Sequence, residues 1–158
     1  IDQLAGVALA LVQGFRKIAV TVALPETAET IRRIHPNTLV FGVHVTGLSE
    51  AEAKMLVGAS DLVTSCASKT IREAVKKNVL VQAGTAIPIF AMTMEGKNLI
   101  MEKIRLSTES VLVKSTKLPA LADRGWLNLF HPWLDAGDRP GFPYYAGRCA
   151  FRPTGGHR

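Results

Sequence analysis

The sequence has few cysteines, no long apolar run and no glycine-rich nucleotide motif. Only Cys66 and Cys149 occur among its 158 residues, which disfavours a disulfide framework. The apolar runs are far shorter than the roughly 20 residues that span a bilayer, so we expect no membrane helix. Neither G-x-G-x-x-G nor a Walker sequence is present, which disfavours nucleotide binding in its standard form. What remains is globular composition, with 47% apolar residues.

The sequence also lacks a start signal and any nucleic-acid-binding motif. The segment Ile1–Leu4 has no initiator methionine and no signal-peptide pattern, so we expect a fragment of a cytoplasmic protein. The formal net charge is +6, but acidic and basic side chains are interleaved. No zinc finger or RNA-binding aromatic motif accompanies them, and nucleic-acid binding is therefore disfavoured.

Composition divides the chain near Leu106. Three aromatic residues precede this point, whereas seven follow it together with most of the prolines. We predict an α/β domain over residues 1–105 and a loosely ordered extension over residues 106–158, which need not be native to the domain. We expect Cys149, His131 and His157 to be exposed residues of that extension, without a functional role.

Between residues 17 and 105, apolar β-branched runs alternate with helix signals. The runs predict strands over residues 17–23, 39–45, 61–65, 79–83 and 87–92. The signals predict helices over residues 2–13, 25–34, 49–57, 69–77 and 94–105. Ser49 and Glu52 have capping-box spacing, Gly58 is expected to stop that helix, and Thr93 to cap the last one. Pro88 predicts an edge or bulged position for the fifth strand.

Strands joined by helices run parallel, and their crossovers are right-handed. The prediction is therefore an α/β fold: a three-layer, mostly parallel, Rossmann-like sheet of 4–5 strands with helices on both faces. The carboxyl ends of such strands meet at one edge, where open α/β sheets bind ligands. Four loops are expected there, namely residues 24–26, 44–47, 65–68 and 82–85.

Two reactive side chains fall in these loops, and we consider them candidate catalytic residues. Cys66 lies in the turn before a predicted helix, and the positive end of that helix favours a thiolate. The nearby positive charge of Lys69 would add to this effect. His44 would orient or deprotonate Cys66 if their strands are neighbours. The alternative is structural: a small buried cysteine and a histidine satisfied by backbone groups. As metal ligands, Cys66 and one histidine are an incomplete set, because a closed site needs four.

The same loops carry small and hydroxyl residues that would bind a phosphate or carboxylate of a ligand or cofactor. These candidates are Thr46, Gly47, Ser65, Ser68, Gly84 and Thr85. Caps and turns would use the same residue types, so that alternative stays open. No particular cofactor is predicted.

Five strings together resemble the carboxyl-terminal half of the methanogenesis marker protein 8 family. They are residues 1–7, 17–23, 41–50, 61–69 and 82–91, including FGVHVTGLSE and DLVTSCASK. The resemblance covers residues 1–105 and implies an archaeal, cytoplasmic protein found with methanogenesis. It also implies a further amino-terminal half with additional cysteines, in which case Cys66 would be one ligand or redox partner of a larger site.

The leading hypothesis is an accessory protein of methanogenesis, serving metal or cofactor handling or the maturation of a methanogenic enzyme. Its partners would be that enzyme or other maturation factors. A second hypothesis is an enzyme that uses Cys66 as a nucleophile on a small anionic substrate. A third is a structural half-domain that pairs with the missing half or with itself.

Overall fold

Five helices and five strands alternate along the part of the chain that the structure describes. The computed structural model describes residues 1–66 and 68–120. The elements are, in order, α1 (Gln3–Val12), β1 (Ala19–Val22), α2 (Pro25–Ile34), β2 (Leu39–Gly42), α3 (Glu50–Ala59), β3 (Leu62–Thr64), α4 (Lys69–Val75), β4 (Val81–Ala83), β5 (Ile89–Ala91) and α5 (Met94–Leu106). Each predicted element is present, with shorter strands than expected. The predictions for Cys149, His131 and His157 lie outside the described residues.

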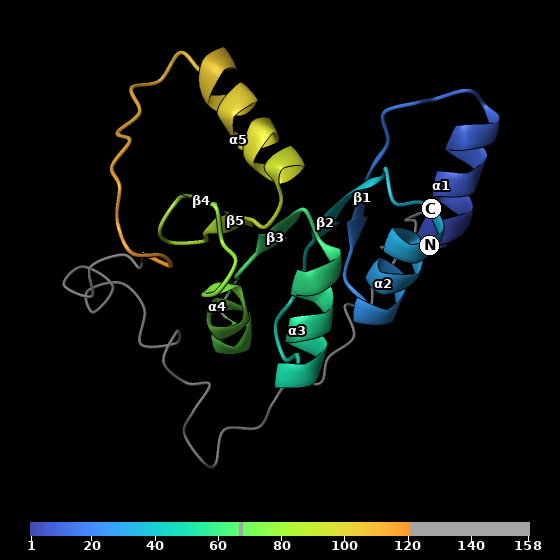
Figure 1. Ribbon diagram of the computed structural model, residues 1–158, viewed down its shortest axis with the longest axis horizontal. Coiled ribbons are helices and arrows are strands. Elements are labelled where there is room, and N and C mark those ends of the chain that lie inside the picture. Colours follow the sequence, from blue (N-terminus) through green and yellow to red (C-terminus); the bar gives the residue numbers. More distant parts are fainter. Residues whose placement is uncertain (67, 121–158) are drawn as a thin grey trace, which may run out of the picture. The chain divides into compact units, whose positions relative to one another are not determined.

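The strands form one mixed sheet in the order β1-β2-β3-β5-β4 (Figure 1). β1, β2 and β3 pair in parallel, with Val20 opposite Val40 and Gly42 opposite Val63. β5 runs antiparallel to both of its neighbours. β4 therefore points in the same direction as β1–β3, and β5 alone is reversed. The predicted α/β class with a mostly parallel strand direction is confirmed.

The predicted edge or bulged position of the fifth strand is wrong. β5 lies inside the sheet, between β3 and β4, and the edge strand at this side is β4. Pro88 comes one residue before β5, so its missing N–H interrupts no ladder bond. Its carbonyl accepts a hydrogen bond from the backbone N–H of Ser65 at 2.9 Å. The proline therefore ends the turn that precedes β5 and leaves the strand intact.

Helices cover both faces of the sheet, as predicted. α2, α3 and α4 pack side by side on one face, and α5 packs on β5 and β4 from the other face (Figure 1). The larger core cluster lies under α2–α4 and comprises Val22, Ala28, Ile31, Val40, Val45, Ala53, Leu56, Val57, Ala59, Val63, Ile71, Val75 and Phe90. The smaller one lies under α5 and comprises Leu62, Ala91 and Ile100 with partly buried neighbours.

Local signals explain where the helices begin. The Ser49 hydroxyl accepts from the Glu52 N–H at 3.3 Å, and the Glu52 carboxylate accepts from the Ser49 N–H at 2.7 Å, so the capping box is confirmed. Thr93 caps α5 through the Gly96 N–H at 3.2 Å. The predicted stop at Gly58 is wrong: α3 continues to Ala59, because Gly58 has no positive φ and Ser60 forms the cap.

None of the helices in residues 1–120 has the length and apolar character that crossing a bilayer requires.

Candidate ligand-binding rim

The carboxyl ends of β1, β2, β3 and β4 share one edge of the sheet, which we call the rim. We define it by residues 24–26, 44–47, 65, 66, 68 and 82–85, which lie at or shortly after the ends of these strands. Because β5 is reversed, the hairpin between β4 and β5 also turns at this edge, through Gly84 with a φ of 77°. Open α/β sheets bind ligands at the carboxyl ends of their strands, which makes the rim the candidate site.

His44 leaves the end of β2 in a left-handed conformation, with a φ of 55°. The preceding Val43 is still held to the sheet, because its N–H donates to the Val22 carbonyl at 2.9 Å. The following Val45 is fully buried in the larger core cluster. The chain must therefore turn sharply at His44, and this turn leaves the imidazole exposed to solvent.

Cys66 occupies the corresponding position after β3, also in a left-handed conformation, with a φ of 42°. The Ser68 N–H donates to the Ser65 carbonyl at 2.8 Å, which closes a tight turn through Cys66. The thiol is half-buried against the larger core cluster, and its Sγ lies 3.4 Å from the Thr64 Oγ1. Cys66 is thus held in place and is partly open to solvent.

These two residues end neighbouring strands, which is the condition on which the proposed pairing of His44 with Cys66 depends. β2 and β3 are hydrogen-bonded neighbours, and adjacent strands lie about 4.8 Å apart. Among the described hydrogen bonds, none joins the two side chains directly. The left-handed region costs a residue with a Cβ roughly 1–2 kcal/mol, and such strain is concentrated at functional sites. Within residues 1–66 and 68–120, His44 and Cys66 are the non-glycine residues with positive φ.

The hydroxyl and glycine candidates divide into two groups. Ser65 and Ser68 are buried, and Ser68 serves as the cap of α4: its Oγ accepts from the Ile71 N–H at 3.3 Å and pairs with Thr70 at 2.8 Å. The Ser65 Oγ donates to the Cys66 carbonyl at 3.2 Å. The exposed candidates at the rim are Thr46, Gly47, Gly84 and Thr85.

The Gln82 side chain, also at the rim, makes hydrogen bonds to the backbone of two other segments. Its Nε2 donates to the carbonyls of Gly84 at 2.8 Å and Ala120 at 2.5 Å. Its Oε1 accepts from the Ala120 N–H at 2.8 Å. A single amide side chain therefore ties the segment after α5 to the end of β4.

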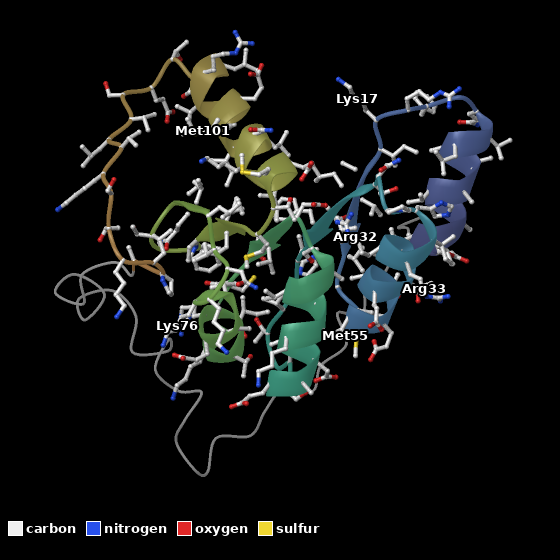
Figure 2. All side chains as sticks on the ribbon, in the orientation of Figure 1. Lys17, Arg32, Arg33, Met55, Lys76 and Met101 are labelled. Carbon is white, nitrogen blue, oxygen red and sulfur yellow. The ribbon has the colours of Figure 1, made fainter. Side chains whose placement is uncertain are left out.

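The best-connected charged group lies at the opposite, amino-terminal end of the strands. The Asp61 carboxylate is buried and accepts from Arg32 at 2.5 Å, from the Val40 N–H at 2.8 Å and from the Thr93 hydroxyl at 2.7 Å. Arg32 also donates to the carbonyls of Pro36, Thr38 and Ala59. Figure 2 shows Arg32 between α2 and the strands, and Arg33 on the outer side of α2.

Sequence reasoning missed this network, which joins α2, β2, β3 and α5. Arg32 and Asp61 are 29 residues apart, so no local pattern connects them. Because their hydrogen-bonding capacity is used by the protein itself, these groups stabilise the fold and leave little for a ligand.

Two cavities also lie at the amino-terminal end of the strands. One, of about 220 Å³, is lined by residues that include Arg16, Ile18 and His35. The other, of about 240 Å³, is lined by residues that include Lys54, Ser60 and Thr93. The described residues contain no group of three or more His, Cys, Asp or Glu side chains arranged to hold a metal ion. Cys66 and His44 alone are therefore at most part of a ligand set.

The strand order and the helices on both faces define an α/β protein with a mostly parallel sheet. Residues 1–105 match the family model described as an uncharacterized protein conserved in archaea (DUF2099), and the chain belongs to this family. It is also 38% identical over 126 residues to "Uncharacterized protein MJ0054" of Methanocaldococcus jannaschii. That match covers 78% of this chain and 44% of the relative, so the chain spans less than half the relative's length. No solved structure matches the chain.

Proposed function

We propose that this chain is part of an accessory protein of methanogenesis, and that its rim forms one wall of a metal- or cofactor-handling site. The observation that carries the proposal is the pair of left-handed residues, Cys66 and His44, at the ends of adjacent strands. A thiolate and an imidazole are the ligand types that zinc, nickel and iron accept. The similarity to a protein of Methanocaldococcus jannaschii supports the methanogenic context. A cytoplasmic location and a relation to methanogenesis marker protein 8 are parts of the proposal.

The remaining ligands would come from outside the described residues. Two protein ligands hold a metal weakly, and structural sites need four. The relative extends well beyond the matched region, so a longer chain of the family has room for further ligands. A methanogenic enzyme or a maturation factor is the other source, as is a second copy of the chain. The exposed rim residues Thr46, Gly47, Gly84 and Thr85 would then contact the anionic groups of a bound cofactor.

The experiment is metal analysis of the complete family protein, which would carry the remaining ligands, purified without oxygen. Iron, zinc and nickel are measured in the wild type, in Cys66→Ala and in His44→Ala, with His35→Ala as a histidine control at the other end of the sheet. We expect a bound metal in the wild type and in His35→Ala, and its loss in Cys66→Ala. Equal metal content and equal partner binding in all four proteins would contradict the proposal that the rim is part of the site.

A second candidate function is a cysteine-dependent reaction on a small anionic substrate. It is favoured by the Thr64 hydroxyl, which lies 3.4 Å from the Cys66 Sγ and is able to donate a hydrogen bond to a thiolate. The test is the pH dependence of Cys66 alkylation. A midpoint well below the free-thiol value of about 8.5 supports a nucleophile, and a midpoint at that value contradicts it.

A further inference from the structure

The described residues leave two uncharged surfaces open, one on β1 and β2 and one on α1. On the sheet, α5 packs against β5 and β4, at the far end from β1 and β2 (Figure 1). Ala19 and Thr21 of β1 are exposed, and Leu39 and Phe41 of β2 are only half-buried. Because side chains alternate along a strand, these residues share the face on which α5 lies, opposite Val22 and Val40.

This part of the sheet carries no charge, although it faces solvent. Parallel strands are normally covered on both faces, and a sheet face that remains in water carries polar or charged side chains. Ala19, Thr21, Leu39 and Phe41 include no charged residue. The composition is therefore that of a covered face.

The second surface is the outer side of α1. Ala5, Leu9 and Val12 are exposed and have the i, i+4, i+7 spacing of one helix face. The ten residues of α1 include no charged side chain. A helix that is apolar all round is typical of a buried position. α1 contacts β1 and α2, and its Leu4 packs against the larger core cluster, so α1 lies at the β1 edge of the sheet.

We infer that these residues form a docking surface for the rest of the family's longer chain. The β1 surface comprises Ala5, Leu9, Val12, Ala19, Thr21, Leu39 and Phe41. The occupant we infer is an apolar-faced helix from the part of the family protein that this chain does not span, since the chain covers 44% of its relative. The open strip is two strands, or about 10 Å, wide, which equals the width of one helix with its side chains. This inference does not rest on the chemistry of Cys66.

Cysteine accessibility in two intact proteins tests the inference. Single cysteines are introduced by Leu9→Cys and Thr21→Cys in this chain, and at the aligned positions of the full-length Methanocaldococcus jannaschii relative. Ala51→Cys, an exposed position on α3, is the matched control. Labelling with a maleimide is followed by peptide mass spectrometry, which separates each site from the native cysteines. We expect all three positions to label rapidly in this chain.

In the full-length relative we expect labelling at the positions of Leu9 and Thr21 to be slower by about tenfold or more, because buried sites react only after local opening. The Ala51 position should label equally in both proteins. Equal rates at all three positions in the relative would overturn the inference. So would protection of Thr21→Cys in this chain that grows with its concentration, because the occupant would then be a second copy.

Discussion

The two ends of the sheet are built differently. At the amino-terminal end, the buried Asp61 carboxylate accepts hydrogen bonds from a side chain of α2, the backbone of β2 and the cap of α5. At the rim, the described residues include no buried carboxylate of this kind. His44 and Cys66 have a left-handed backbone, and the imidazole faces solvent. The comparison indicates that one end stabilises the fold, so that the other is free to keep reactive groups in a costly conformation.

The largest effect is expected from Asp61→Ala, which removes the centre of the amino-terminal network. Arg32, the Val40 N–H and the Thr93 hydroxyl would lose a partner together. Removing one partner of a buried ion pair typically costs about 3–5 kcal/mol, so we expect the free energy of unfolding to fall by that amount. Urea denaturation measures it.

The matched control for this variant is Glu73→Ala, which breaks the exposed pair with Lys76 on α4. Surface ion pairs contribute little to stability because solvent screens them, so this change should be small. If both variants lost equal stability, the amino-terminal network would not be the stabilising element that we describe.

Gly96→Ala is expected to have the next largest effect. A Cβ at Gly96 would overlap the backbone carbonyl of Asp61, where the first turn of α5 crosses the start of β3. Overpacking of this kind typically costs about 1–3 kcal/mol. The control is Gly58→Ala in α3, where a Cβ meets nothing within 4 Å and alanine should add about 0.5–1 kcal/mol. Thermal unfolding of the two variants should therefore shift in opposite directions.

Ser49→Ala tests a smaller contribution that depends on pH. Loss of the cap should cost about 1 kcal/mol at neutral pH. Hydrogen bonds from the Ser49 side chain and backbone lower the pKa of Glu52 in the folded protein. The Glu52 contribution is therefore fully present above the unfolded-state value of about 4.3 and is lost as the pH falls through the lower folded pKa. Denaturation between pH 7 and pH 3 should show the stability difference between the two proteins becoming smaller, since the part due to the Glu52 carboxylate is lost and the cap bond to the Glu52 N–H remains. A constant difference would contradict this account.

The smallest effect is expected from His44→Gly, and it has the opposite sign. Glycine adopts a positive φ without the Cβ penalty, and the exposed imidazole contributes little packing. We expect a gain of about 0.5–1 kcal/mol, together with loss of any ligand that the rim binds. His35→Gly is the control, because His35 has a φ of −126° and glycine should not stabilise it. Destabilisation by His44→Gly would show that the strain is not real.

The helix bounds and caps that depend on neighbouring residues could be predicted from the sequence. α2 has its predicted bounds, because Pro25 suits the first turn and His35–Pro36 ends the helix. The capping box at Ser49 needed only the spacing to Glu52. The reversal of β5 was not predictable from Pro88, because strand order depends on contacts across the whole sheet.

The backbone conformation and the ion pair at the two ends of the sheet also depend on more than local sequence. The positions of His44 and Cys66 at strand ends followed from their apolar neighbours, but their left-handed backbone was not predicted. Histidine, like asparagine, is enriched at positive φ and is a weak signal for that conformation, whereas cysteine is no signal for it. The Arg32–Asp61 pair had no sequence signal at all.

The central claim is that Cys66 and His44 bind one ligand together at the rim. Nuclear magnetic resonance of the reduced protein during a zinc titration tests it most directly. We expect the His44 ring and the Cys66 Cβ signals to shift together, and the His44 shift to vanish in Cys66→Ala. Shifts at His35 instead, or a His44 shift that survives in Cys66→Ala, would contradict the claim.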